Sequence, residues 1–266
     1  MHTYRIDPPG ACLAYHDFPG EEPVCLFLHG LGASSSADFP EIAAFPALRR
    51  YRSILVDFFG FGFSQRPYGF SYSLDAHAQT IVSLLKHLEI SHRSCVLIGH
   101  SMGGAVAITI AAITSSPFAG LVIAEGNLDP GGGFVSRPIS AQRETEFVER
   151  GYAEFLRILD DRPHVSDYAA SVRAADPLAL HRSAVSLKAG TTPTMRERFV
   201  TLQVPRTYLF GEKSLPNPDE QSLPRHGLTV DIIPAAGHNM MHDNPTGFVN
   251  AVARAIARCQ DTGAGR

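Results

Sequence analysis

Residues 94–110 read SCVLIGHSMGGAVAITI. An apolar run typical of a buried strand ends at Ile98, and an alanine-rich helical pattern begins after the GHSMG of residues 99–103. The pattern Gly-x-Ser-x-Gly between a strand and a helix predicts a strained turn that exposes the serine hydroxyl at the C-terminal end of the strand. Glycine is expected at residues 99 and 103 because a side chain there would collide with the neighbouring strand and helix. Ser101 is therefore the candidate nucleophile.

The size and composition of the chain favour one soluble α/β domain with a modest insertion. The chain has 266 residues, of which 44% are hydrophobic and 18% charged, and its net charge is −3. It has no run of Lys or Arg that would favour nucleic acid or an anionic membrane as a partner. The N-terminus lacks the basic start and apolar core of a secretory signal. The longest apolar stretch, near residues 105–113, is far too short to span a membrane.

The four cysteines form no CxxC or Cys/His pattern typical of a metal site. A reduced, cytoplasmic protein is therefore expected, with no metal and no organic cofactor. The expected partner is a small-molecule substrate, and the sequence does not determine the oligomeric state.

Short apolar runs alternate with longer amphipathic segments, which predicts a doubly wound, mostly parallel central sheet covered by helices. The expected strands are residues 11–16, 24–28, 53–56, 95–98, 121–124, 207–210 and 228–233. The expected helices are residues 40–50, 74–88, 102–114 and 246–258.

This alternation is interrupted at residues 127–204, where charged helical stretches replace the apolar strands. We expect a helical insertion there, entered through the glycines at 131–133 and functional because of its length. The core domain would then consist of residues 1–126 and 205–266.

A second motif, HGLG at residues 29–32, follows the apolar run 24–28. Acyl transfer requires preformed donors for the oxyanion that develops on the substrate. The backbone N–H of Met102, directly after the nucleophile, is one expected donor, and the N–H of Leu31 in this glycine-containing loop is the other. His29 is interpreted as a residue that braces the loop.

A third motif lies in the stretch IIPAAGHNMMHDNP at residues 232–245. A serine hydroxyl is a poor nucleophile until a base accepts its proton, so a histidine on a late loop is expected. His238 follows a glycine directly beyond the predicted strand, which makes it the candidate base. His242 is its nearest competitor.

These motifs, together with the DFFGFGFSQRP loop that starts at Asp57, resemble the α/β-hydrolase superfamily in its capped esterase, lipase and dehalogenase-like branch. The resemblance covers essentially the whole chain outside the insertion. It implies an α/β-hydrolase fold with a helical cap inserted after the sixth strand of that fold, which matches residues 127–204. It also implies that Asp57 and Asp243 brace loops. The motifs are specific for the fold and not for the substrate.

The chain departs from the family pattern at the expected acid. Members of this family usually carry an aspartate in a Gly-x-x-Asp pattern after the seventh strand, and here Ser214 stands at that position. Some members place the acid at the end of the sixth strand, where this chain has Glu125. The order Ser101, Glu125, His238 then preserves nucleophile, acid and histidine. Glu125 is the expected acid, Glu212 and Asp219 are the alternatives, and a site without an acid stays open.

The expected activity is hydrolysis of a carboxylic ester of a small, largely apolar substrate through an acyl-enzyme. An apolar pocket is expected from aromatic and methionine side chains near the site, namely Phe58, Phe59, Phe61, Phe63, Met240 and Met241. Hydrolysis of a C–C bond, lactone or thioester, or cofactor-free perhydrolysis, is an alternative on the same residues. A small-molecule receptor with a decayed triad is the alternative of another class. The absence of an aspartate nucleophile disfavours haloalkane and epoxide hydrolysis.

Overall fold

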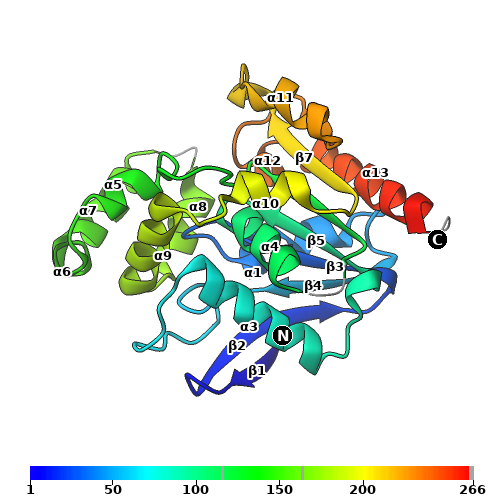
Figure 1. Ribbon diagram of the computed structural model, residues 1–266. Helices are drawn as coiled ribbons and strands as arrows, with labels where there is room; N and C mark the ends of the chain where they lie inside the picture. Colours follow the sequence, from blue (N-terminus) through cyan, green and yellow to red (C-terminus); the bar gives the residue numbers. More distant parts are fainter. Residues whose placement is uncertain (115–116, 163–164, 264–266) are drawn as a thin grey trace.

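The computed structural model describes residues 1–114, 117–162 and 165–263, which build a sheet of eight strands flanked by helices (Figure 1). The strand order is β1-β2-β4-β3-β5-β6-β7-β8. The strands are β1 (His2–Ile6), β2 (Ala11–Phe18), β3 (Glu21–Leu28), β4 (Tyr51–Val56), β5 (Cys95–His100), β6 (Gly120–Ala124), β7 (Arg206–Gly211) and β8 (Thr229–Ile233). Strands β1 and β2 pair antiparallel with their neighbours and the others pair in parallel. The predicted doubly wound, mostly parallel fold is confirmed.

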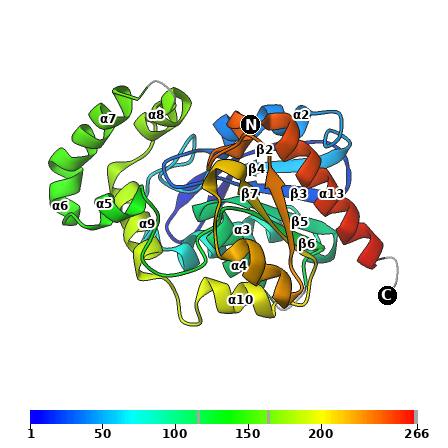
Figure 2. The same ribbon diagram turned by 90° about the horizontal axis from the view of Figure 1, so that it is seen from above.

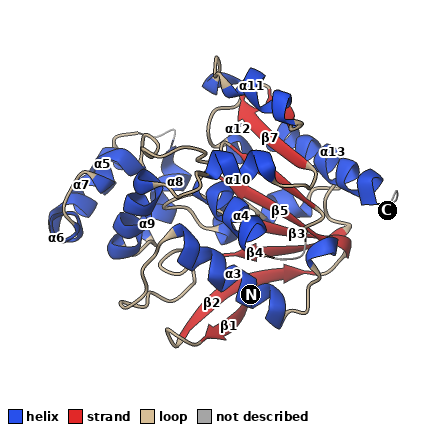
Figure 3. Cartoon of the chain, viewed as in Figure 1, coloured by secondary structure: helices blue, strands red, loops and turns tan. Residues whose placement is uncertain are grey.

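The helical elements lie on both faces of the sheet and beyond the ends of its central strands (Figures 2 and 3). The α-helices are α1 (Ser35–Asp38), α2 (Pro40–Ala44), α3 (Leu74–His87), α4 (Met102–Ile113), α5 (Ser136–Ser140), α6 (Glu144–Glu146), α7 (Tyr152–Asp160), α8 (Ser166–Arg173), α9 (Pro177–Ala189), α10 (Met195–Thr201), α11 (Asp219–Ser222), α12 (Met240–Asp243) and α13 (Pro245–Gly263). Short 3₁₀ turns are η1 (His92–Ser94), η4 (Glu212–Ser214) and η5 (Leu223–His226), and η2 (Phe147–Gly151) is a π-helical turn. None of the helices in the described ranges is long and apolar enough to cross a membrane.

Alternate residues of the buried strands face two separate cores. On β3, Leu28 packs into the cluster that contains α3 and α4, whereas Phe27 packs into the cluster that contains α2 and α13. Burial on both faces is the reason that the central strands are continuous apolar runs. Strand β1 was not predicted because it is an edge strand whose residues are mostly exposed and polar.

The helix predicted at residues 40–50 is shorter in the structure, because α2 ends at Ala44. Phe45 precedes Pro46 and has an extended backbone, with φ −59° and ψ 143°. A residue before proline is pushed out of the α region by contact with the proline ring. The proline therefore ends the helix despite the apolar spacing that follows it.

Residues 127–204, called the inserted segment below, contain helices and no strand in the part that the structure describes. Helices α5 to α9 lie beyond the end of the sheet (Figure 1). Helix α9 is tied to the core, since the Asp176 amide before it donates to the Gly60 carbonyl at 2.7 Å. Helix α10 packs on α4, where the Thr109 hydroxyl lies 3.5 Å from the sulfur of Met195.

Candidate active site

Ser101 occupies the turn between β5 and α4, and its backbone has a conformation that residues other than glycine rarely adopt. Its φ is 51° and its ψ is −117°, which is a strained geometry for a residue with a Cβ. A Cβ on Gly99 would collide with the backbone of Gly103, and a Cβ on Gly103 would collide with the carbonyl of Leu28. Both glycines of the motif are therefore required by the close packing of strand, turn and helix.

Glu125 and His238 are joined by a short hydrogen bond. His238 Nδ1 lies 2.7 Å from Glu125 Oε2, and Glu125 Oε1 accepts the Gly211 N–H at 2.9 Å. Burial opposes ionisation of this carboxyl, but hydrogen bonds from His238, the Ser214 side chain and Gly211 hold the pKa of Glu125 below its ordinary value. An ionised Glu125 accepts a hydrogen bond from the Nδ1–H of His238, and in this tautomer Nε2 carries the free lone pair.

The two alternative carboxylates lie away from His238 and have other partners. Glu212 Oε2 accepts the Ala235 N–H at 2.7 Å. Asp219 pairs with both terminal nitrogens of Arg196 at 2.7 and 2.8 Å. Neither carboxylate contacts the imidazole of His238, so of these candidates Glu125 alone lies against it.

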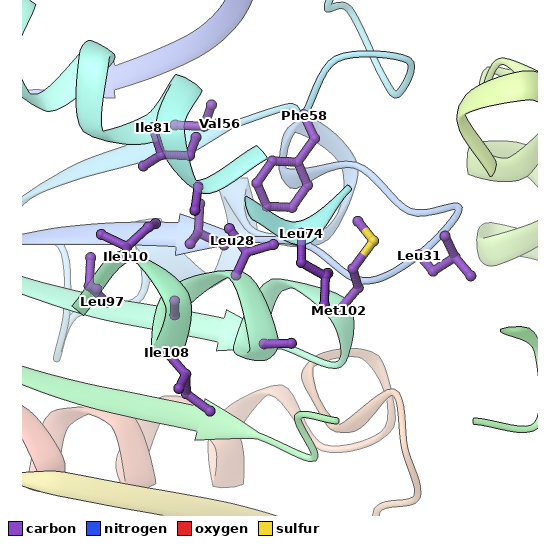
Figure 4. Packing of buried hydrophobic residues seen from close by; sticks show 14 of the residues in the cluster. Leu28, Leu31, Val56, Phe58, Leu74, Ile81, Leu97, Met102, Ile108 and Ile110 are labelled. Carbon is purple, nitrogen blue, oxygen red and sulfur yellow. The ribbon is translucent and has the colours of Figure 1, made fainter. Parts of the chain in front are cut away.

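The loop at residues 30–32 approaches Ser101 closely. A Cβ on Gly30 would lie 3.3 Å from the Cβ of Ser101, so a side chain at this position would crowd the serine. The N–H of Leu31 has no protein acceptor in the part of the chain that the structure describes. Met102 is the first residue of α4, so its N–H has no partner within the helix. Its side chain points into the core (Figure 4), which leaves the backbone as the part of Met102 available to the site.

His29 holds this loop in place through hydrogen bonds to the backbone. Its Nε2 accepts the Phe58 N–H at 3.0 Å, so Nδ1 carries the proton that is donated to the Gly30 carbonyl at 2.8 Å. Complete burial lowers the pKa of His29, which keeps the ring neutral. Both ring nitrogens are thus used in holding the backbone.

His100 supports the loop of His238 and was not singled out from the sequence. Its Nε2 donates to the His238 carbonyl at 2.9 Å, while its buried Nδ1 has no partner among the described residues. Burial is the first cause that lowers the pKa of His100 well below its ordinary value, so the ring is neutral. The signal in the sequence was its place directly before Ser101 in the turn.

Asp57, Asp243 and His242 make hydrogen bonds that hold loops in place. Asp57 accepts hydrogen bonds from both the amide and the hydroxyl of Ser36. Asp243 accepts the Gly237 N–H at 2.7 Å, directly before His238 in the chain. His242 Nε2 lies 3.1 Å from Asp38 Oδ1 and makes no contact with Glu125.

A cavity of about 660 Å³ opens over the turn and is lined by Ser101, His238 and Leu31. Much of its apolar wall comes from the inserted segment. These side chains are Phe134, Val135, Ile139, Phe147, Phe155, Ile158, Leu159 and Leu187. The cavity is therefore formed between the end of the sheet and the inserted segment.

The prediction that the phenylalanines after Asp57 and the methionines after His238 line this pocket is wrong. Five of these residues are buried in the core, and the sixth is 65% exposed and outside the cavity: Phe58, Phe59, Phe61, Met240 and Met241 are buried and Phe63 is exposed. These apolar side chains are close to the site in sequence, but they pack into the cores on the two faces of the sheet because burial removes their apolar surface from water.

The chain is similar to curated and solved proteins over different lengths. It is 39% identical to the mouse (Mus musculus) mesoderm-specific transcript protein over 88 residues, which is 33% of this chain and about a quarter (26%) of the mouse protein. A thermophilic esterase from Thermogutta terrifontis has the same fold with a TM-score of 0.79 and 22% identity, covering 97% of this chain and 99% of the esterase. An enol-lactonase from Burkholderia xenovorans has a TM-score of 0.77 and 18% identity, covering 96% and 100% of the two chains. At these identities the solved structures show a shared fold.

The model of the alpha/beta hydrolase family matches residues 25–252. That range begins at the strand before the Leu31 loop, includes the Ser101 turn and Glu125, and extends beyond His238. Because the match covers well over half of the 266 residues, the chain belongs to the alpha/beta hydrolase family.

Proposed function

We propose that this protein is a serine hydrolase that cleaves a carboxylic ester of a small, largely apolar substrate through an acyl-enzyme. The observation that carries the proposal is the 2.7 Å contact between Glu125 Oε2 and His238 Nδ1 at the cavity that Ser101 lines. A carboxylate that holds Nδ1 orients the imidazole and stabilises the imidazolium formed during the reaction. Ser214 stands where the family usually carries its acid, and the Glu125 carboxylate against His238 favours an enzyme over a receptor with a decayed triad.

In the proposed reaction, Ser101 Oγ attacks the ester carbonyl while His238 Nε2 accepts the hydroxyl proton. The N–H groups of Leu31 and Met102 stabilise the oxyanion. The carbon–oxygen bond to the alcohol then breaks, and the alcohol leaves with the proton from His238. Water attacks the acyl-enzyme with the same base, and the acid product and free Ser101 are formed.

The inserted segment, residues 127–204, is proposed to act as a cap over the site. Its support is the apolar wall that this segment contributes to a cavity of about 660 Å³. A pocket of this size and character favours an apolar small molecule. A lactone is an internal ester and needs the same residues, and the fold shared with an enol-lactonase favours lactone hydrolysis as the second candidate.

A series of p-nitrophenyl esters with rising acyl length tests the proposal, with Ser101→Ala as the blank. We expect hydrolysis by the natural protein and a loss of several orders of magnitude in the variant. A fluorophosphonate probe should label the protein at Ser101 and leave Ser101→Ala unlabelled. A natural protein that neither turns over esters and lactones nor labels would overturn the proposal in favour of a receptor.

A further inference from the structure

Tyr168 connects the inserted segment to the loop that carries the Leu31 N–H. Its hydroxyl, on α8, donates to the Leu31 carbonyl oxygen at 2.9 Å. The contact between helix and loop is tight, since a Cβ on Gly32 would lie 2.8 Å from the Tyr168 hydroxyl and 3.0 Å from Val172. Gly32 has a φ of +78°, so this position favours glycine for its backbone as well as for the lack of space.

The loop is held on both sides of Leu31, since His29 donates to the Gly30 carbonyl and Tyr168 donates to the Leu31 carbonyl. Gly30 and Gly32 have no Cβ to restrict their backbone angles, so the Leu31 backbone can rotate unless something holds it. The Leu31 carbonyl has the Tyr168 hydroxyl as its one protein donor within residues 1–114, 117–162 and 165–263. The Leu31 N–H lies in one peptide plane with the Gly30 carbonyl, which His29 holds. The Tyr168 hydrogen bond holds the next peptide plane, between Leu31 and Gly32, and so limits rotation about the Leu31 Cα.

We propose that Tyr168 is a positioning residue, which keeps the Leu31 N–H directed at the developing oxyanion. The direction of this N–H then depends on α8 remaining packed against the loop. This inference rests on the proposed function. A donor must be fixed before the reaction to stabilise the transition state more than the substrate. The tyrosine ring also lines the cavity, so the side chain lies between the substrate space and the loop.

Burial supports this role. It is the first cause that raises the pKa of Tyr168, so the phenol remains a neutral donor over the pH range in which ester hydrolases work. The loop leads into α1, where the Asp38 contact with His242 provides a second tie at 3.1 Å. The Tyr168 hydrogen bond differs from the contact between Asp38 and His242 because its donor belongs to the inserted segment.

Tyr168→Phe tests the inference because it removes the hydroxyl and keeps the ring. Removal of a donor from an oxyanion hole lowers kcat by about 10²–10³. Loss of a residue that positions such a donor should lower kcat less, by about tenfold, with KM changed by less than about twofold. The affinity for an alkyl trifluoromethyl ketone, which forms a tetrahedral adduct on serine, should fall by a similar factor. Hydrogen exchange at residues 30–33 should become faster.

Tyr152→Phe is the matched control. The Tyr152 hydroxyl also donates to backbone carbonyls, those of Val172 at 2.8 Å and Ala175 at 3.2 Å, but both lie within the inserted segment. Its removal should leave kcat, ketone affinity and exchange at residues 30–33 unchanged. Thermal unfolding of both variants checks that each is folded.

Three results would overturn the inference. The first is natural kcat and ketone affinity in Tyr168→Phe. The second is an equal loss in Tyr152→Phe, which would indicate a general effect on the inserted segment. The third is a loss confined to KM, which would make Tyr168 a substrate contact. Failure of the proposed function is distinguishable, because the natural protein would then lack turnover that depends on Ser101 while the exchange experiment would still report on the loop.

Discussion

Glu125 uses both carboxylate oxygens, one for His238 and one for the Gly211 amide. Removing its charge should therefore impair the support of the imidazolium while most of the geometry survives. We expect Glu125→Gln to lower kcat by about 10³–10⁴. Steady-state ester hydrolysis measures this loss.

Glu212→Gln is the control for that variant. Glu212 accepts the Ala235 amide, and a glutamine oxygen can accept the same bond, so we expect little change in kcat. A large loss in Glu212→Gln together with a small one in Glu125→Gln would show that the acid has been misassigned.

Phe134 lies beside His238 and is 73% exposed although it lines the cavity. Its ring centroid is 6.5 Å from that of His238, with the planes at 83°. In the proposed reaction His238 gives its proton to the leaving oxygen, so we expect Phe134 to contact the alcohol part of the substrate. We expect Phe134→Ala to lower kcat/KM for a benzyl ester by about three- to tenfold relative to the ethyl ester of the same acid.

Phe63→Ala is the matched control for Phe134→Ala, since Phe63 is also exposed but lies outside the cavity. It should leave the ratio of the two esters unchanged. An equal loss for benzyl and ethyl esters in Phe134→Ala would contradict a contact with the alcohol.

At the scale of elements, α1 and α12 are joined by the hydrogen bond between Asp38 and His242. The hydrogen bond that His242 donates to Asp38 is the first cause that raises the pKa of His242, so the folded protein binds this proton more tightly than the unfolded chain. The resulting stability is present below the ordinary histidine pKa of about 6.5 and is lost as the pH rises through the raised value.

Replacement of this histidine should therefore matter more in mild acid. We expect His242→Gln to lower Tm more at about pH 5.5 than at about pH 8.5, as measured by thermal unfolding. His226→Gln, at an exposed position outside the cavity, serves as the control. A difference in Tm that grows with pH would have the wrong sign for this pair.

At the scale of the whole molecule, the core on the α13 side of the sheet is separate from the cavity. Phe248 of α13 is fully buried in that core and does not line the cavity. We expect Phe248→Ala to lower the free energy of unfolding by about 3–5 kcal/mol, because it leaves a large void. Denaturant unfolding measures this change. The folded variant should keep the natural kcat, and a large loss of kcat would show that this core and the site are coupled.

Much of the core fold can be predicted from the sequence because the patterns that indicate it are formed by consecutive residues. The strand, turn and helix around Ser101 are consecutive residues, and strands buried on both faces appear as continuous apolar runs. Strand β1 and the end of α2 were not predicted correctly. An exposed edge strand carries little apolar pattern, and Pro46 overrides the helical spacing around it.

The sequence by itself determined the strained turn at Ser101, the late histidine loop and the helical character of residues 127–204, because each depends on neighbours in the chain. Only the tertiary structure decided which carboxylate contacts His238, since Glu125 lies 113 residues away along the chain. The tertiary structure alone also decided that the cavity wall comes from the inserted segment and that Tyr168 reaches Leu31. Such contacts depend on how separate elements pack, and spacing along the chain does not encode the distance between side chains that meet only after folding.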